Sequence, residues 1–97
     1  MAIVVLAPDV YDDFDRIFEL LAEQSPETAV VRIEEIVQAF DILQSSPLIG
    51  SPAEGGKREL VISAGARGYM AVYRYAADMD TVFVLAVHSQ LEKRPPL

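Results

Sequence analysis

Two apolar runs near the C-terminus constrain the fold more than any other feature of the sequence. Residues 67–75 read RGYMAVYRY and residues 81–88 read TVFVLAVH, with a short polar stretch between them. Alternate side chains of a strand point to opposite faces, so the first run predicts one face with Tyr69, Ala71, Tyr73 and Tyr75 and another with Met70, Val72 and Arg74. The two runs predict adjacent antiparallel strands, and the second is apolar enough to be central in its sheet.

The N-terminal half predicts a strand and two amphipathic helices that pack on this sheet. Residues 3–7 (IVVLA) end at a proline and predict a strand buried on both faces. Apolar residues recur at helical spacing through residues 10–21, and residues 25–27 (SPE) are a start signal for a second helix that runs to Leu43. The turn between them is short, which predicts an antiparallel helix hairpin. The opposite face of the first helix is polar and should be wet: Asp13, Arg16, Glu19 and Glu23.

Turn-forming residues dominate residues 44–57, which predicts a long connection with several turns. Leu48 and Ile49 are expected to pin the middle of this connection to the core. Residues 58–63 (RELVIS) then predict the next strand, and residues 64–66 (AGA) a turn.

The order of these elements predicts an α+β fold. It contains an N-terminal strand, an antiparallel helix hairpin and three consecutive antiparallel strands that form one sheet with the first strand. Residues 89–97 read as a polar tail. So few strands do not fold without the helices, so we expect residues 1–97 to form a single domain.

The charge of the chain is acidic and uneven. The formal net charge is −7, and residues 1–56 carry only Arg16 and Arg32 against eleven carboxylates, whereas residues 57–97 have a small positive excess. Binding to nucleic acid depends on Lys and Arg at the phosphates, so direct nucleic-acid binding is not expected. Solvated helix faces explain the acidic half, and the C-terminal half is the anion-facing side.

The composition also excludes several kinds of site. The chain has no cysteine and one histidine, and its carboxylates are not clustered at ligand spacing, so no disulfide, metal or cofactor is expected. The apolar runs are shorter than the roughly 20 residues that span a bilayer, and no charged leader precedes a hydrophobic segment. We therefore expect a soluble, cytoplasmic protein.

Four short motifs occur in an order that resembles the RelE/ParE superfamily of bacterial type II toxins. They are residues 47–50 (PLIG), 58–60 (REL), 68–74 (GYMAVYR) and 84–92 (VLAVHSQLE). The resemblance covers nearly the whole chain. It implies the RelE/ParE-like fold and a toxin that is neutralised by a cognate antitoxin.

Departures from the ribonuclease branch of the superfamily favour its ParE-like branch. The ribonucleases cut messenger RNA on the ribosome with basic residues on the strand, an arginine after the Gly-Tyr pair, and a basic or histidine cluster after the last strand. Here those positions hold Val61, Ser63, Met70, Ser89 and Leu91. Cleavage needs proton transfer and charge stabilisation from such groups. The resemblance therefore implies a ParE-like inhibitor of DNA gyrase rather than an enzyme.

Four basic residues are the candidates for contact with the target: Arg58, Arg67, Arg74 and His88. In the alternative interpretation, a RelE-like ribosome-dependent mRNA endoribonuclease, the same residues would contact RNA, with His88 and Arg74 as the catalytic candidates. Each also has a structural explanation. Arg58 and Arg74 could form ion pairs, and His88 could be a hydrogen-bonded residue at a strand end.

The implied antitoxin predicts a second binding surface. Family antitoxins wrap a helix and an extended segment around the toxin, with apolar anchors beside the helix hairpin and a strand or loop near the sheet. Leu20, Val30 and Val31 lie off the main apolar stripes, so we expect them to contact the antitoxin. A third hypothesis is a degenerate member that binds an antitoxin and is no longer toxic.

Overall fold

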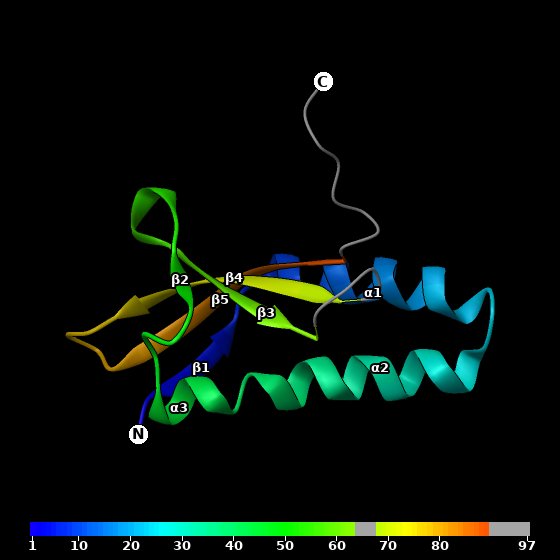
Figure 1. Ribbon diagram of the computed structural model, residues 1–97, viewed down its shortest axis with the longest axis horizontal. Coiled ribbons are helices and arrows are strands. Elements are labelled where there is room, and N and C mark those ends of the chain that lie inside the picture. The colour runs from blue at the N-terminus through cyan, green and yellow to red at the C-terminus, as the bar shows by residue number, and fades with distance from the viewer. Residues whose placement is uncertain (64–67, 90–97) are drawn as a thin grey trace.

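The computed structural model describes residues 1–63 and 68–89 and shows a twisted sheet with a helix hairpin (Figure 1). The elements are β1 (Ile3–Leu6), α1 (Pro8–Ala22), α2 (Pro26–Ala39), α3 (Ile42–Ser45), β2 (Ser51–Pro52), a 3-10 turn η1 (Glu54–Gly56), β3 (Arg58–Ile62), β4 (Tyr69–Ala76) and β5 (Thr81–Ser89). The predicted α+β order of elements is confirmed.

Within the described residues, the sheet has five strands in the order β1-β5-β4-β3-β2. β1 runs parallel to β5, and all other neighbours are antiparallel. β5 is therefore an interior strand, as predicted. The prediction had four strands, because the two residues of β2 lie inside the long connection and pair with only two residues of β3.

The helix hairpin forms where the capping residues predicted it. The Ser25 hydroxyl accepts a hydrogen bond from the Thr28 N–H at 3.3 Å, and Pro26 begins α2. The second helix ends at Ala39 rather than at Leu43, because the Phe40 N–H turns back to the Val37 carbonyl and closes a tighter turn. α3 then carries Leu43 into the core.

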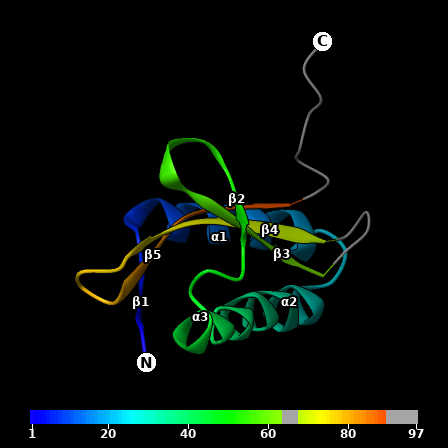
Figure 2. The same cartoon turned by 60° about the vertical axis from the view of Figure 1, so that its left-hand side comes forward.

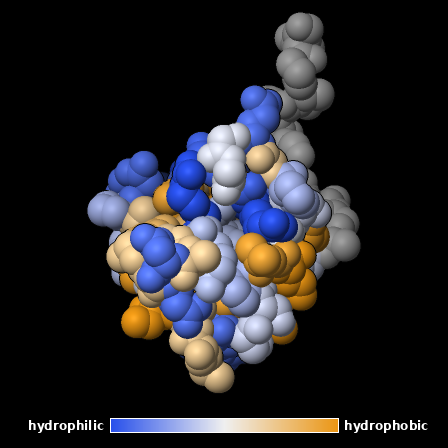
Figure 3. Space-filling model, turned by 90° about the vertical axis from the view of Figure 1, so that its left-hand side faces the viewer, coloured by the Kyte–Doolittle hydropathy of each residue, from blue (hydrophilic) through white to orange (hydrophobic). Residues whose placement is uncertain are grey.

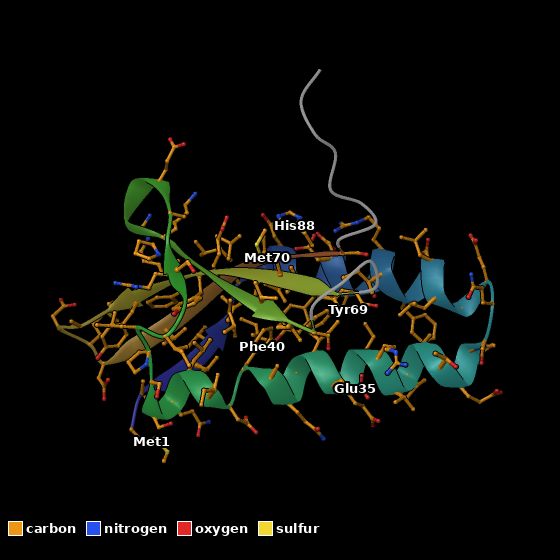
Figure 4. All side chains as sticks on the ribbon, viewed as in Figure 1. Met1, Glu35, Phe40, Tyr69, Met70 and His88 are labelled. Carbon is orange, nitrogen blue, oxygen red and sulfur yellow. The ribbon has the colours of Figure 1, made fainter. Side chains whose placement is uncertain are left out.

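The core lies between one face of the sheet and the helices. Its buried members include Val10 and Ile17 of α1, Ile36 and Phe40 at α2, and Tyr69, Tyr73, Val82, Val84 and Val87 of the sheet. Figure 4 shows Phe40 and Tyr69 between the sheet and α2, with Met70 and His88 on the opposite side of the sheet. The alternating pattern of β4 therefore separates a core face from an outer face, and the tyrosines serve mainly as core residues.

β1 is an edge strand, so the prediction of a strand buried on both faces is wrong. Its even-numbered residues, Val4 and Leu6, pack against the core, whereas Ile3 is 63% and Val5 40% exposed. Figure 2 shows β1 at the margin of the sheet beside β5. The helices cover only one face, and an apolar run of this length does not reveal which face is covered.

The polar face of α1 is not uniformly wet, which corrects a second expectation. The Asp13 side chain is only 14% exposed; its carboxylate accepts the Val87 N–H at 2.9 Å and pairs with Arg16 at 2.9 Å. β1 ends at Leu6, while β5 continues to Ser89. Asp13 thus satisfies a backbone donor of β5 beyond the end of its neighbouring strand.

The connection before β3 is pinned by Gly50 rather than by Leu48 and Ile49, which are both exposed. Gly50 is buried, and its N–H donates to the Tyr73 hydroxyl at 2.8 Å. The expectation that apolar residues would anchor this connection is therefore wrong.

The end of the molecule that carries the β4–β5 turn mixes hydrophilic and hydrophobic side chains on its surface (Figure 3).

Candidate functional site

The first candidate surface is the outer face of the sheet, which we call the outer sheet face. It is formed on β4 and β5 by Met70, Val72, Arg74, Phe83 and His88, in a register that pairs Met70 with His88 and Arg74 with Phe83. The helices pack on the other face. Backbone pairing therefore puts two of the predicted target contacts, Arg74 and His88, on one surface.

Arg74 and His88 share this face but do not form a cluster. His88 lies opposite Met70, and Arg74 is four residues further along β4, which separates their rows by about 13 Å. Both are exposed, and neither has a hydrogen bond or ion pair within residues 1–63 and 68–89. They can contact a ligand that spans several residues, but this arrangement does not bring the two groups to one reacting atom.

Arg58 is on the opposite face and is already engaged. It pairs in register with buried Tyr73, and its Nη1 donates to the carbonyls of Leu48 at 3.2 Å and Gly50 at 2.8 Å. The structure thus gives Arg58 a role in holding the connection against the sheet. Arg67, the remaining predicted target contact, lies outside the described residues.

The second candidate surface is a groove between the two helices, which we call the hairpin groove. It has a volume of about 240 Å³ and is lined by Phe14, Asp15 and Phe18 of α1 and by Val30, Ile33 and Glu34 of α2. Phe18 is 37% and Val30 48% exposed. Phe18 belongs to the apolar stripe of α1. The sequence signal that could have predicted the groove is the width of this stripe, which is too broad to be buried entirely.

Of the three predicted antitoxin contacts, only Val30 lines the hairpin groove. Leu20 lines a separate cavity of about 150 Å³ at the end of the hairpin where the turn joins α1 to α2, together with Tyr69 and Ser89 of the sheet. Val31 is exposed next to Val30, but the 3.6-residue helical repeat turns it away from the groove. Lying off the main stripe therefore does not place these residues on one surface.

The helix hairpin carries the charge of the protein. Residues 8–39 contain nine carboxylates and two arginines, an excess equal to the formal charge of −7 of the whole chain. Both arginines are bonded within their own helices, Arg16 to Asp13 at 2.9 Å and Arg32 to Glu35 at 2.7 Å. The hairpin is thus strongly acidic, whereas the rest of the sequence is balanced.

The β4–β5 turn perturbs the pKa of Tyr75. The Tyr75 hydroxyl donates to the Asp80 carboxylate at 2.7 Å, and this hydrogen bond raises the pKa of Tyr75 above its ordinary value. Within residues 1–63 and 68–89, no three potential metal ligands come together. In the same part of the chain no helix combines the length and the apolar character needed to cross a bilayer.

Comparisons with known proteins agree with this architecture. A family model described as the ParE toxin of the type II toxin-antitoxin system parDE matches residues 4–94. A search of curated proteins found no significant match.

Solved structures share the fold. The chain is similar to a chain of the chromosomal ParDE TA system from P. aeruginosa, with a TM-score of 0.78 and 22% identity over 92% of this chain and 96% of that one. A chain of the intact E. coli RelBE toxin-antitoxin complex gives a TM-score of 0.63 and 15% identity, over 97% of this chain and all 100% of that one. The isolated E. coli RelE toxin gives 0.62 and 14%, over 98% and 88%.

Proposed function

Because the chain belongs to the family of ParE toxins of type II toxin–antitoxin systems, we propose that it inhibits DNA gyrase and is neutralised by a cognate antitoxin. We place the protein in the cytoplasm, where it would encounter gyrase. The outer sheet face would hold the target through Arg74 and His88, and Arg67 stays in the proposed set. Arg58 would support this surface indirectly by fixing the connection behind it.

The distance between Arg74 and His88 is the observation that favours an inhibitor over a nuclease. Their rows are about 13 Å apart along β4, and Met70 and Val72 occupy the outer face between them. An acid–base pair that cleaves RNA must reach one phosphodiester, whereas a binding surface can use contacts that are spread out. The charge of −7 supports the same choice, because RNA favours a basic surface.

The proposed antitoxin would contact the hairpin groove through Val30. Apolar side chains that remain exposed beside a helix pair are suitable anchors for a partner helix. Leu20 stays a proposed contact on a neighbouring surface, and Val31 would lie at the edge of the same interface. The similar solved structures come from a ParDE TA system and from a RelBE toxin-antitoxin complex, and this supports the proposal of an antitoxin as the partner.

A second candidate function is the RelE-like mRNA endoribonuclease. It is favoured by one observation: His88 and Arg74 are exposed and lack partners in the described part of the chain, as groups that contact RNA would be. A degenerate, non-toxic member is the third candidate.

Controlled expression, with and without the gene adjacent to this one, tests the proposal. We expect growth arrest that the neighbour relieves, and loss of supercoiling by purified gyrase. Arg74→Ala should weaken this inhibition, whereas Arg32→Ala on α2 is the matched control and should not. Growth arrest with active gyrase and codon-positioned mRNA cuts would favour the nuclease. Unaffected growth at high expression would favour the degenerate member.

A further inference from the structure

The hairpin groove has an apolar floor and an acidic rim. Its floor is made by Phe14, Phe18, Val30 and Ile33, and the two remaining lining residues are Asp15 and Glu34. Phe14 and Ile33 also pack against the core, so the floor is held in place by the fold. The groove therefore presents fixed apolar contacts with a carboxylate on each helix.

The apolar floor continues along both helices. Tyr11 precedes Phe14 by one turn of α1, and Val37 follows Ile33 by one turn of α2; both are exposed. Each line of side chains covers two helical turns, or about 10 Å. This length fits a short amphipathic helix with apolar residues at positions i, i+3 or i+4, and i+7.

The rim charges have no cation of their own in the part of the chain that the structure describes. Asp15 and Glu34 are exposed and form no ion pair there. The two arginines of the hairpin are bonded to Asp13 and Glu35. A ligand in the groove thus meets uncompensated negative charge, which attracts cations and repels a second copy of the same acidic hairpin.

We infer that the hairpin groove binds a basic amphipathic helix, in which an apolar stripe is flanked by Lys or Arg. This inference rests on the proposed function, in which the helix is a segment of the antitoxin. The apolar stripe supplies affinity, and the flanking cations supply selectivity by pairing with the acidic rim. The excess charge of the whole hairpin also speeds encounter with a basic partner, so association should slow as salt increases.

Two synthetic helical peptides with the same apolar stripe test this inference. One carries Lys and the other Glu at the flanking positions, and both are held helical by the same cross-link. Binding to the full chain is followed by fluorescence anisotropy at about 0.05 M and about 0.5 M salt. We expect the Lys peptide to bind about tenfold more tightly at low salt, and the difference to shrink at high salt. Equal binding of the two peptides would overturn the inference.

Variants of the chain locate the effect. Asp15→Asn with Glu34→Gln should weaken the Lys peptide about fivefold, the effect of two exposed ion pairs. Glu54→Gln with Asp78→Asn changes the net charge equally outside the hairpin and should have little effect. Val30→Ser should weaken both peptides. If the control pair matches the rim pair, or Val30→Ser changes nothing, the groove is not the binding site.

The growth assay separates this inference from the proposed function. Growth arrest on expression together with failure of the Lys peptide would overturn only the basic-helix inference. Selective binding of the Lys peptide without growth arrest would overturn only the assignment of an active toxin.

Discussion

Gly50 lies at a point where the chain leaves no room for a side chain. A Cβ at this position would be 2.7 Å from Cε1 and 2.8 Å from the hydroxyl oxygen of Tyr73, and 2.8 Å from the Glu59 carbonyl oxygen. Gly50 is not among the residues with positive φ, so alanine would fit the local backbone. The cost of Gly50→Ala therefore comes from crowding against a buried ring and a strand carbonyl.

The size of this cost follows from packing and hydrogen bonding. Overpacking a core costs about 1–3 kcal/mol, and an outward shift would also stretch the bond from the Gly50 N–H to Tyr73 and the bond from Arg58 to the Gly50 carbonyl, each 2.8 Å long. We expect Gly50→Ala to lower the free energy of unfolding by about 2 kcal/mol, which is about 10 °C in Tm for a domain of this size.

Urea unfolding followed by circular dichroism measures this cost, and Gly55→Ala is the matched control. Gly55 has φ +71°, and a Cβ added there would have no neighbouring atom within 4 Å, so its substitution adds only left-handed backbone strain of about 1 kcal/mol. Combining Gly50→Ala with Tyr73→Phe should cost less than the sum of the two, because the hydroxyl contact is then absent. A Gly50→Ala protein as stable as the Gly55→Ala protein would refute the crowding argument.

Three further predictions concern polar contacts. Asp13→Ala should lower stability by about 1–3 kcal/mol, since the Val87 N–H loses its acceptor, and hydrogen exchange at Val87 should become faster. Arg58→Ala should cost about 1–2 kcal/mol in urea unfolding while leaving gyrase inhibition by the folded protein unchanged. Folding raises the pKa of Tyr75 through Asp80, so this stabilisation is present below the unfolded pKa and is lost as pH rises through the raised pKa. Above about pH 10, the ordinary pKa of tyrosine, Tyr75→Phe should therefore lose stability less steeply than the parent protein.

The helix hairpin and the last two strands could be predicted because their side-chain periods record burial directly. The alternation in β4 separates Tyr69 and Tyr73 from Met70, and the structure confirms this split. The position of β1 could not be predicted in the same way. Ile3 pairs with Thr81 near the other end of the chain, and a short apolar run contains no information about its distant partner or about which face stays open.

The two candidate surfaces were predictable to different degrees. Val30 could be placed in an interface because it falls outside the apolar stripe yet is apolar. The same argument could not show that Leu20 and Val31 lie on different surfaces from Val30. Positions outside the apolar stripe are spread over all the remaining sides of a helix. The role of Arg58 depends on the carbonyls of Leu48 and Gly50, which reach it only after the connection folds back. No local pattern predicts such a contact.

The parallel pairing of β1 with β5 imposes an order on the folding of the chain during its synthesis. α1 and α2 are close in sequence, so the hairpin can begin to form while the chain is being translated. β1 has to wait for β5, because Ile3 pairs with Thr81 and Leu6 with Val84. We expect the surface for the antitoxin to exist on the nascent chain before the outer sheet face is assembled. A force-sensitive arrest peptide behind the hairpin, compared with one behind β5, would measure this delay, and a single folding event only after β5 would disprove it.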